Sequence, residues 1–236
     1  MATTVNKQRV LQQLVTPPRH AKAGEPEPRP VLEQFLYAIC REGVTREVAD
    51  RAFRNLREQY FDWNEVRVSS ARELAESMAC LPDAENRGQR VIDFLQEVFE
   101  TTFSFDLESL HKKGLKQAAK QLSRYQAAND YIVASVIQQS LGGHAIALDA
   151  ASLRVLRRLG IIEGDIDDLE TLRASLEHQI PKAKGATFND AVSAIASEVC
   201  LEEPRCASCP LCPHCPTGQE MKHSVAAGPA HRVKPR

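Results

Sequence analysis

The sequence predicts an all-α fold, from the spacing of its apolar residues, its helix-start signals and the absence of strand patterns. Between Pro30 and residue 199, apolar residues recur at the three- and four-residue intervals that place them on one helix face. Ser, Thr, Asp or Asn precedes several of these segments, and their side chains cap the first N–H groups of a helix. No segment combines alternating polarity with flanking turn residues, as a half-buried strand would. We therefore expect helices throughout.

The predicted helices are joined by short connections and divide the chain into four parts. Residues 1–29 combine a short amphipathic helix with a proline-rich linker, which cannot be helical throughout. The helical body covers residues 30–199, a cysteine-rich loop covers 200–216, and the polar segment 217–236 is expected to be disordered. The helices predicted in the body lie at residues 31–40, 45–61, 69–81, 85–103, 106–113, 114–122, 129–141, 149–161, 166–180 and 188–200.

Composition indicates an ordinary globular protein. The 236 residues are 43% hydrophobic, which suffices for a buried core, and the formal net charge of -1 does not indicate a general polyanion binder. No apolar run reaches the roughly 18 residues of a membrane span, and the N-terminus lacks the apolar core of a signal peptide. We expect no membrane partner and a cytoplasmic location.

Five of the seven cysteines fall between Cys200 and Cys215, which is the first specific signal in the sequence. Clustered thiols in a cytoplasmic protein bind metal more often than they form disulfides. Thiolate ligands favour zinc or an iron–sulfur cluster. Cys200, Cys206, Cys209 and Cys215 lie close enough in sequence to converge on one centre, and Cys212 is an additional thiol inside the last interval.

The spacing favours a cluster but leaves alternatives open. A zinc ribbon normally uses two Cys-x-x-Cys pairs separated by a long loop, whereas here all the cysteines lie in one short loop. A structural zinc site and a redox-active thiol cluster remain the alternatives. A second register, Cys206, Cys209, Cys212 and Cys215 followed by proline, is similar to a ferredoxin-like run, so that five thiols compete for four places.

The loop and the order of the helices resemble the endonuclease III family of DNA glycosylases. The resemblance is clearest at Pro204-Arg205-Cys206-Ala207-Ser208-Cys209 and at Ala145-Ile146-Ala147-Leu148-Asp149, and it extends weakly over nearly the whole chain. It implies a two-lobed helical fold with a helix-hairpin-helix region and a C-terminal 4Fe-4S cluster. The resemblance favours Cys200, Cys206, Cys209 and Cys215 as the predicted ligands, with Cys212 as the spare thiol. The gap after Cys200 is five residues, one fewer than the family's usual six.

The resemblance assigns a catalytic role to Asp149. Cleaving the bond between a base and its sugar builds positive charge on the ribose, and a nearby carboxylate stabilises it or helps to activate water. The base must first be flipped out of the duplex. A simpler reading needs no catalysis, because Asp before a helix is a preferred N-cap.

The chain departs from the family at its hairpin, residues 125–131, where neither of the family's two glycines is present. Ala127 and Asn129 lie in this hairpin, and Tyr131 occupies the place of the lysine that forms a Schiff base in bifunctional members. The resemblance implies DNA contacts by these three residues and by Arg154 and Arg205. The acidic pair Glu202-Glu203 would repel phosphates in the loop.

These features predict a monofunctional DNA N-glycosylase of base-excision repair, without lysine-dependent lyase activity, that acts as a monomer on double-stranded DNA. The alternative is a catalytically weak or inactive paralogue that keeps the fold and the cluster and binds DNA or a protein. A redox protein built around the five cysteines is a third reading. The sequence does not identify the base, because specificity depends on pocket shape.

Overall fold

A computed structural model describes residues 2–16, 28–162 and 168–226, and within these ranges the chain forms α-helices and short 3-10 turns but no strand. The predicted all-α class is therefore confirmed. The helices are α1 (Ala2–Leu14), α2 (Val31–Arg41), α3 (Arg46–Gln59), α4 (Trp63–Val68), α5 (Ala71–Ser77), α6 (Ala84–Thr102), α7 (Leu115–Leu122), α8 (Asp130–Gln139), α9 (Ala150–Arg158), α10 (Leu169–Gln179), α11 (Gly185–Glu198) and α12 (Pro216–Ala226). The 3-10 turns are η1 (Glu108–Lys112), η2 (Lys182–Lys184), η3 (Cys206–Ser208) and η4 (Cys212–His214).

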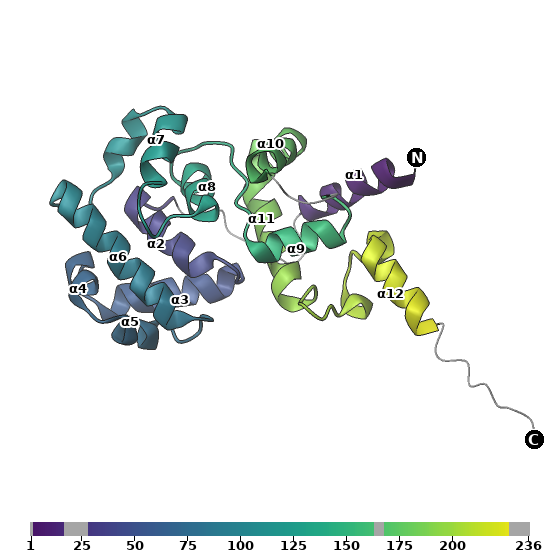
Figure 1. Cartoon of the computed structure of the whole chain (residues 1–236), viewed down its shortest axis with the longest axis horizontal. Coiled ribbons are helices and arrows are strands. Elements are labelled where there is room, and N and C mark those ends of the chain that lie inside the picture. Colours follow the sequence, from purple (N-terminus) through teal and green to yellow (C-terminus); the bar gives the residue numbers. More distant parts are fainter. Residues whose placement is uncertain (1, 17–27, 163–167, 227–236) are drawn as a thin grey trace, which may run out of the picture.

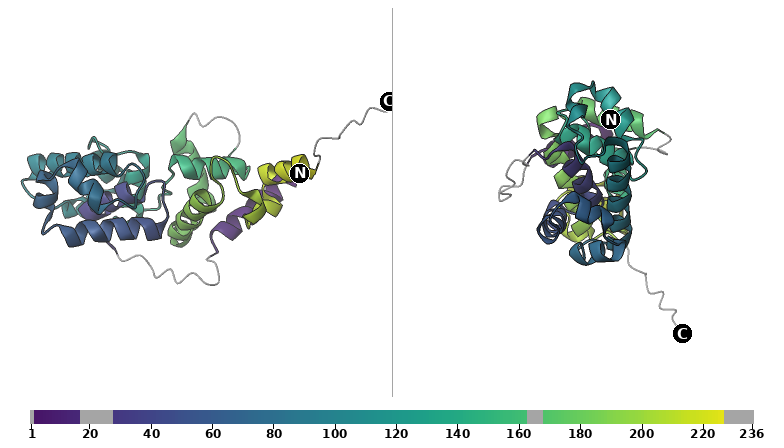
Figure 2. Two further views of the ribbon diagram at one scale, coloured as in Figure 1. Left: turned by 90° about the horizontal axis from the view of Figure 1, so that it is seen from below. Right: turned by 90° about the vertical axis from the view of Figure 1, so that its left-hand side faces the viewer.

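The helices form two lobes side by side, as Figures 1 and 2 show. The first lobe contains α2 to α8, and its core surrounds the apolar helix α2, which packs against α3, α6 and α8. Phe35 of α2 stacks on Phe94 of α6 with ring centroids 3.7 Å apart, and the edge of Tyr125 meets both rings. This core therefore ties the central helix to the segment between α7 and α8.

The second lobe combines the start of the chain with its last third. Helix α1 packs against α11, although nearly the whole first lobe lies between them in sequence (Figure 1). The second core includes Leu14 of α1, Val155 of α9 and Phe188 of α11, and it extends to Leu211 and Cys215 of the cysteine loop. The loop is therefore part of the packed lobe.

Helix starts follow the predicted capping chemistry. Ser70 and Glu73 form a capping box, in which the Ser70 hydroxyl accepts the Glu73 N–H and the Glu73 carboxylate accepts the Ser70 N–H. Asn129 and Asp149 cap α8 and α9. Thr45 occupies the N-cap position of α3, but its side chain accepts no capping hydrogen bond.

The structure differs from the predicted elements over residues 45–68 and 106–113. The helix expected over residues 45–61 ends at Gln59, and the sequence analysis missed α4, whose six residues are too short to show periodicity. Asp62 starts α4 by accepting the Glu65 N–H at 2.8 Å. The segment expected to be helical at 106–113 forms the 3-10 turn η1.

The prediction of disorder over residues 217–236 was wrong for its first half, because residues 216–226 form α12. The Thr217 hydroxyl donates to the carbonyl of Arg158 at 3.2 Å, and the Gly218 N–H donates to Cys215 Sγ at 3.4 Å. These contacts hold a polar helix that periodicity does not predict. Residues 227–236 and most of the predicted linker, 17–27, lie outside the described residues.

Each described helix is too short or too polar to cross a membrane.

Candidate functional site

Asp149 lies where the two lobes meet, and its carboxylate is held from both sides. Its Oδ1 atom accepts the Ser152 N–H of α9 at 2.7 Å, and its Oδ2 atom accepts the Gly43 N–H of the first lobe at 2.8 Å. The side chain is 9% exposed. Gly43 has φ of 73°, in the left-handed region that favours glycine. The expected N-cap and the candidate catalytic carboxylate are thus one group at the junction between the lobes.

The turn between α2 and α3 carries Gly43 and is anchored to the second lobe. Arg41 is buried and donates to Ser193 Oγ at 2.6 Å and to Asp190 Oδ1 at 3.1 Å, both on α11. The Ser193 hydroxyl in turn donates to the carbonyl of Val44 at 2.7 Å. The sequence analysis missed Arg41, and its only local signal was a charged residue ending an otherwise apolar helix.

Within the first lobe, the hairpin between α7 and α8 is held by Glu42, which follows α2, and by Arg90 of α6. Asn129 Oδ1 accepts the Ile132 N–H at 2.9 Å, and its Nδ2 donates to Glu42 Oε1 at 2.7 Å. Arg90 of α6 donates to Glu42 Oε2 at 2.9 Å and to the carbonyl of Ala127 at 3.2 Å. Ala127 is buried, and the side chain of Asn129 is engaged in capping and in the bond to Glu42.

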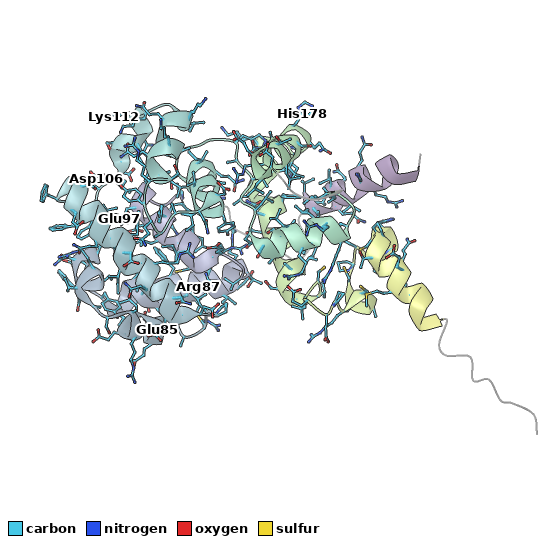
Figure 3. The ribbon with its side chains drawn as sticks, viewed as in Figure 1. Glu85, Arg87, Glu97, Asp106, Lys112 and His178 are labelled. Carbon is cyan, nitrogen blue, oxygen red and sulfur yellow. The ribbon has the colours of Figure 1, made fainter. Side chains whose placement is uncertain are left out.

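One backbone N–H of this hairpin already donates to a carboxylate. The Gln126 N–H points at Glu97 of α6, with Oε2 at 3.0 Å and Oε1 at 3.2 Å. Figure 3 labels Glu97 along α6, on the side of the first lobe away from the second. Glu97 therefore places a negative charge where the resemblance predicts contact with phosphate.

Tyr131 is buried in α8 close to the charged groups of the junction. Burial is the main reason that the pKa of its phenol lies above the ordinary value; Arg41 lowers that pKa, and Asp149 and Glu42 raise it further. The phenol is therefore neutral at neutral pH. Its position near Asp149 is the one at which the resemblance placed the lysine of lyase members.

The two arginines predicted to contact DNA lie near the cysteine loop. Arg154 points into the second lobe, where its Nε donates to the carbonyl of Cys200 at 3.1 Å and its guanidinium reaches Glu202 Oε1 at 2.9 Å. Arg205 is exposed and lines a surface hollow that also includes Arg154 and Glu203. Arg154 thus neutralises one of the loop carboxylates, and Arg205 remains accessible.

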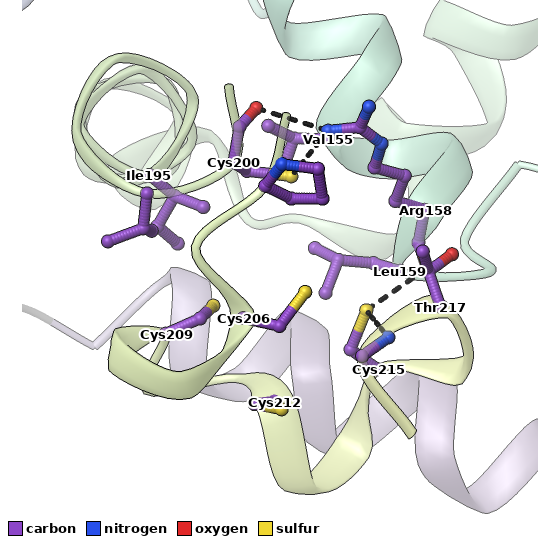
Figure 4. Close-up of a pocket in the computed structure, with 13 residues that line it drawn as sticks. Val155, Arg158, Leu159, Ile195, Cys200, Cys206, Cys209, Cys212, Cys215 and Thr217 are labelled. Carbon is purple, nitrogen blue, oxygen red and sulfur yellow. Dashed lines mark hydrogen bonds between the residues drawn. The ribbon is translucent and has the colours of Figure 1, made fainter. Parts of the chain in front are cut away.

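The structure brings all five cysteines of the loop around one small cavity. Figure 4 shows Cys200 beside the Arg158 side chain of α9 and Cys215 near Leu159 and Thr217, with Cys206 between them. All five are free thiols. The other residues that line the cavity are Val155, Arg158, Leu159, Ile195, Val199, Pro204, Thr217 and Gly218.

Successive tight turns bring the loop cysteines together. The Cys209 N–H donates to the Cys206 carbonyl at 3.2 Å, the Cys212 N–H to the Cys209 carbonyl at 3.1 Å, and the Cys215 N–H to the Cys212 carbonyl at 3.3 Å. Each of these bonds closes a tight turn, so that a cysteine returns to the wall of the cavity at every third residue of the loop.

Two donors reach the sulfurs of the cavity from outside the loop. Arg158 approaches Cys200 Sγ at 3.6 Å, and the Gly218 N–H lies 3.4 Å from Cys215 Sγ. Burial raises the pKa of the Cys209 and Cys215 thiols above the ordinary value. Over the described ranges, no three Cys, His, Asp or Glu side chains converge closely enough to hold a single metal ion.

The overall fold matches solved DNA glycosylases. A non-covalent endonuclease III–DNA complex matches with a TM-score of 0.66 and 18% identity over 92% of this chain and 98% of that one. A thermostable thymine-DNA glycosylase matches with a TM-score of 0.64 and 16% identity, over 93% of this chain and 100% of that one. The 3-methyladenine DNA glycosylase of H. pylori, bound to 1,N6-ethenoadenine, matches with a TM-score of 0.54 and 17% identity, over 79% of this chain and 94% of that one.

Sequence comparison adds nothing to this result, since no family model matches the chain and no curated protein does. The predicted helix-hairpin-helix region is confirmed as α7, the 123–129 connection and α8. The chain therefore has the two-lobed, all-α fold of the endonuclease III-like helix-hairpin-helix DNA glycosylases.

Proposed function

We propose that this chain is a DNA-repair protein that removes a flipped, damaged or mispaired base, and that it is a monofunctional N-glycosylase. The carrying observation is the place of Asp149: a buried carboxylate at the start of α9, at the junction of the two lobes of a glycosylase fold. The similar structures include an endonuclease III bound to DNA, which supports double-stranded DNA as the partner.

In this proposal, Asp149 acts on the sugar. Each of its oxygens accepts one backbone N–H, which fixes the carboxylate in place and leaves further lone pairs for a ligand. A fixed negative charge beside the sugar stabilises the cation that develops as the base departs. Tyr131 lies near this carboxylate and has no amine, so that it forms no Schiff base with the opened sugar.

The cysteine loop would hold a soft metal centre through Cys200, Cys206, Cys209 and Cys215. The donor set fits, because the cavity is lined by thiols and otherwise largely by apolar side chains, with no Asp, Glu or His among them. A zinc ion needs its sulfurs at about 2.3 Å from one point, and the described side chains do not converge so tightly. A 4Fe-4S cluster distributes its cysteines over several iron atoms, which favours it over zinc. Bound there, the cluster would supply a structural cross-link between Cys200, just after α11, and the turns of the loop that carry the other three cysteines.

The test of the activity uses duplexes with oxidised pyrimidines, uracil mismatches or adenine mispairs, followed by alkali to reveal abasic sites. We expect strand cleavage after alkali for at least one duplex with the wild-type protein and none with Asp149→Asn. Arg205→Gln is the matched control: it removes an exposed charge near the loop and is expected to weaken DNA binding while the protein still releases the base. Cleavage that survives Asp149→Asn would contradict the role of Asp149.

A second candidate is a DNA- or protein-binding paralogue without catalysis. It is favoured by the hairpin, where Glu97 accepts the Gln126 N–H and Arg90 donates to the Ala127 carbonyl. These internal bonds engage groups that would otherwise be available to a phosphate. Binding of duplex DNA with no release of any base, under conditions in which a known glycosylase is active, would favour this candidate over the first.

A further inference from the structure

We propose that Cys212 is a fifth ligand position of the cysteine centre and takes the place of Cys206 when that residue is lost. The inference rests on the proposed soft metal centre and names a ligand beyond the four assigned to it. Five thiols line the cavity, and a centre with four cysteine ligands leaves one of them over.

Cys212 is a buried thiol at the wall of the cavity. It is 3% exposed, it lines the cavity, and its sulfur makes no hydrogen bond with another described residue. The chain leaves space for it, because a Cβ atom at Gly218 would lie only 3.0 Å from Cys212 Sγ. A buried donor at the wall of a cavity lined by four other thiols has the position of a ligand.

Cys206 and Cys212 occupy equivalent positions in two similar turns. Cys206 is the first residue of η3 and Cys212 is the first residue of η4, and each turn ends at a second cysteine, Cys209 or Cys215. The backbone therefore presents two Cys-x-x-Cys turns in succession, linked by the Cys212 N–H bond to the Cys209 carbonyl at 3.1 Å. The first cysteine of each turn lines the same cavity.

Cys206 is the ligand that Cys212 is best placed to replace. Both thiols line the same cavity, and they belong to consecutive turns of one short loop. Cys206 is also more exposed than Cys212, and its sulfur lies 3.6 Å from Met221 Sδ at the open side of the loop. Loss of Cys206 thus removes an outer ligand and leaves the buried thiol beside the vacated position.

The exchange is a substitution of one thiolate for another. Cys212 releases its proton to solvent and its sulfur binds the metal. The bond between the metal and the Cys206 sulfur is lost in the same exchange. No electron is transferred, and no further reactant is required. In the wild-type chain, a displaced Cys206 thiolate would take up the proton that Cys212 releases.

The test compares the metal content of cysteine variants of the full chain. Cys206→Ser, Cys212→Ser and the double variant are purified without oxygen and reconstituted with iron and sulfide, and iron, sulfide and zinc per chain are measured with the visible absorbance. We expect both single variants to keep the wild-type metal content and the double variant to lose it. Cys80→Ser, in the first lobe, is the matched control and is expected to change nothing.

Two outcomes would overturn the inference: loss of metal from Cys206→Ser alone to the level of the double variant, or retention of metal by the double variant. Far-ultraviolet circular dichroism checks the helix content of each variant, and Cys206→Ala and Cys212→Ala repeat the comparison without a hydroxyl. Cys200→Ser is expected to lose the metal, since Cys212 does not occupy its position. A wild-type chain that binds neither iron nor zinc would instead overturn the proposed centre, and with it the exchange.

Discussion

Asp149 accepts a hydrogen bond from the backbone N–H of Gly43, 106 residues earlier in the chain, and this 2.8 Å bond joins the two lobes. The same carboxylate caps α9 through Ser152. Its geometry therefore depends on both lobes at once. Small changes in their relative position would move the carboxylate that the proposed reaction requires.

Asp149→Ala is expected to lower the free energy of unfolding by about 1–2 kcal/mol, because it removes an N-cap and the bond to Gly43. Asp149→Asn keeps one acceptor oxygen and is expected to lose less stability, while both variants lose base release. Denaturant unfolding measures the difference. Asp168→Ala is the matched control, since it removes the exposed cap of α10 and leaves the junction intact. Unchanged stability of Asp149→Ala would contradict the role of Asp149 as a link between the lobes.

Arg41→Met is expected to destabilise the protein by about 3 kcal/mol, because it removes a buried guanidinium that hydrogen-bonds to Ser193 and Asp190 of α11. The Arg41 side chain is 8% exposed and pairs with Asp190 at 3.1 Å. Arg46 pairs with the other oxygen of Asp190 but is 21% exposed, so that Arg46→Met is expected to cost only about 1 kcal/mol. Denaturant unfolding of the two variants tests this order. Equal losses would show that burial does not distinguish the two pairs.

The sequence alone identified most helices and the cysteine loop, but it did not reveal how the lobes are joined. Apolar periodicity and capping residues act locally, which is why α2, α6 and the N-cap at Asp149 were predicted. The bonds from Gly43 to Asp149 and from Arg41 to α11 connect distant segments, and no local pattern encodes them. Helix α12 was not predicted for a related reason: its polar sequence is held by contacts with the end of α9 and with the cysteine loop.

Glu97→Gln is expected to increase affinity for duplex DNA, because it removes a negative charge from the hairpin and keeps an acceptor for the Gln126 N–H. Unit charges ~8 Å apart in water interact by about 0.5 kcal/mol, which corresponds to roughly twofold in affinity at low salt. Fluorescence anisotropy with a labelled duplex measures the change. Glu100→Gln makes the same charge change one turn further along α6 and is expected to have a smaller effect. Equal effects would argue against a specific role of the hairpin.

Borohydride is expected to trap no covalent complex between this protein and damaged DNA, because Tyr131 has no amine to form a Schiff base. Gel electrophoresis of reduced reaction mixtures measures this. Endonuclease III, for which a trapped covalent intermediate with DNA has been solved, is the positive control. An adduct with the present chain would identify a different nucleophile, and Lys116→Ala and Lys120→Ala would then test the nearest lysines of α7.

Removing the metal is expected to loosen the second lobe and to leave the first lobe intact. Cys215 belongs to the second core, together with Val155 of α9 and Phe188 of α11, whereas the first core contains no residue of the cysteine loop. Loss of a cross-link at Cys215 should therefore speed amide exchange in α9, α11 and α12 and spare α2 and α6. Hydrogen–deuterium exchange of the metal-loaded and chelator-treated protein measures both lobes in one experiment. A uniform increase across both lobes would contradict this localisation, because it would indicate that the metal stabilises the fold as a whole.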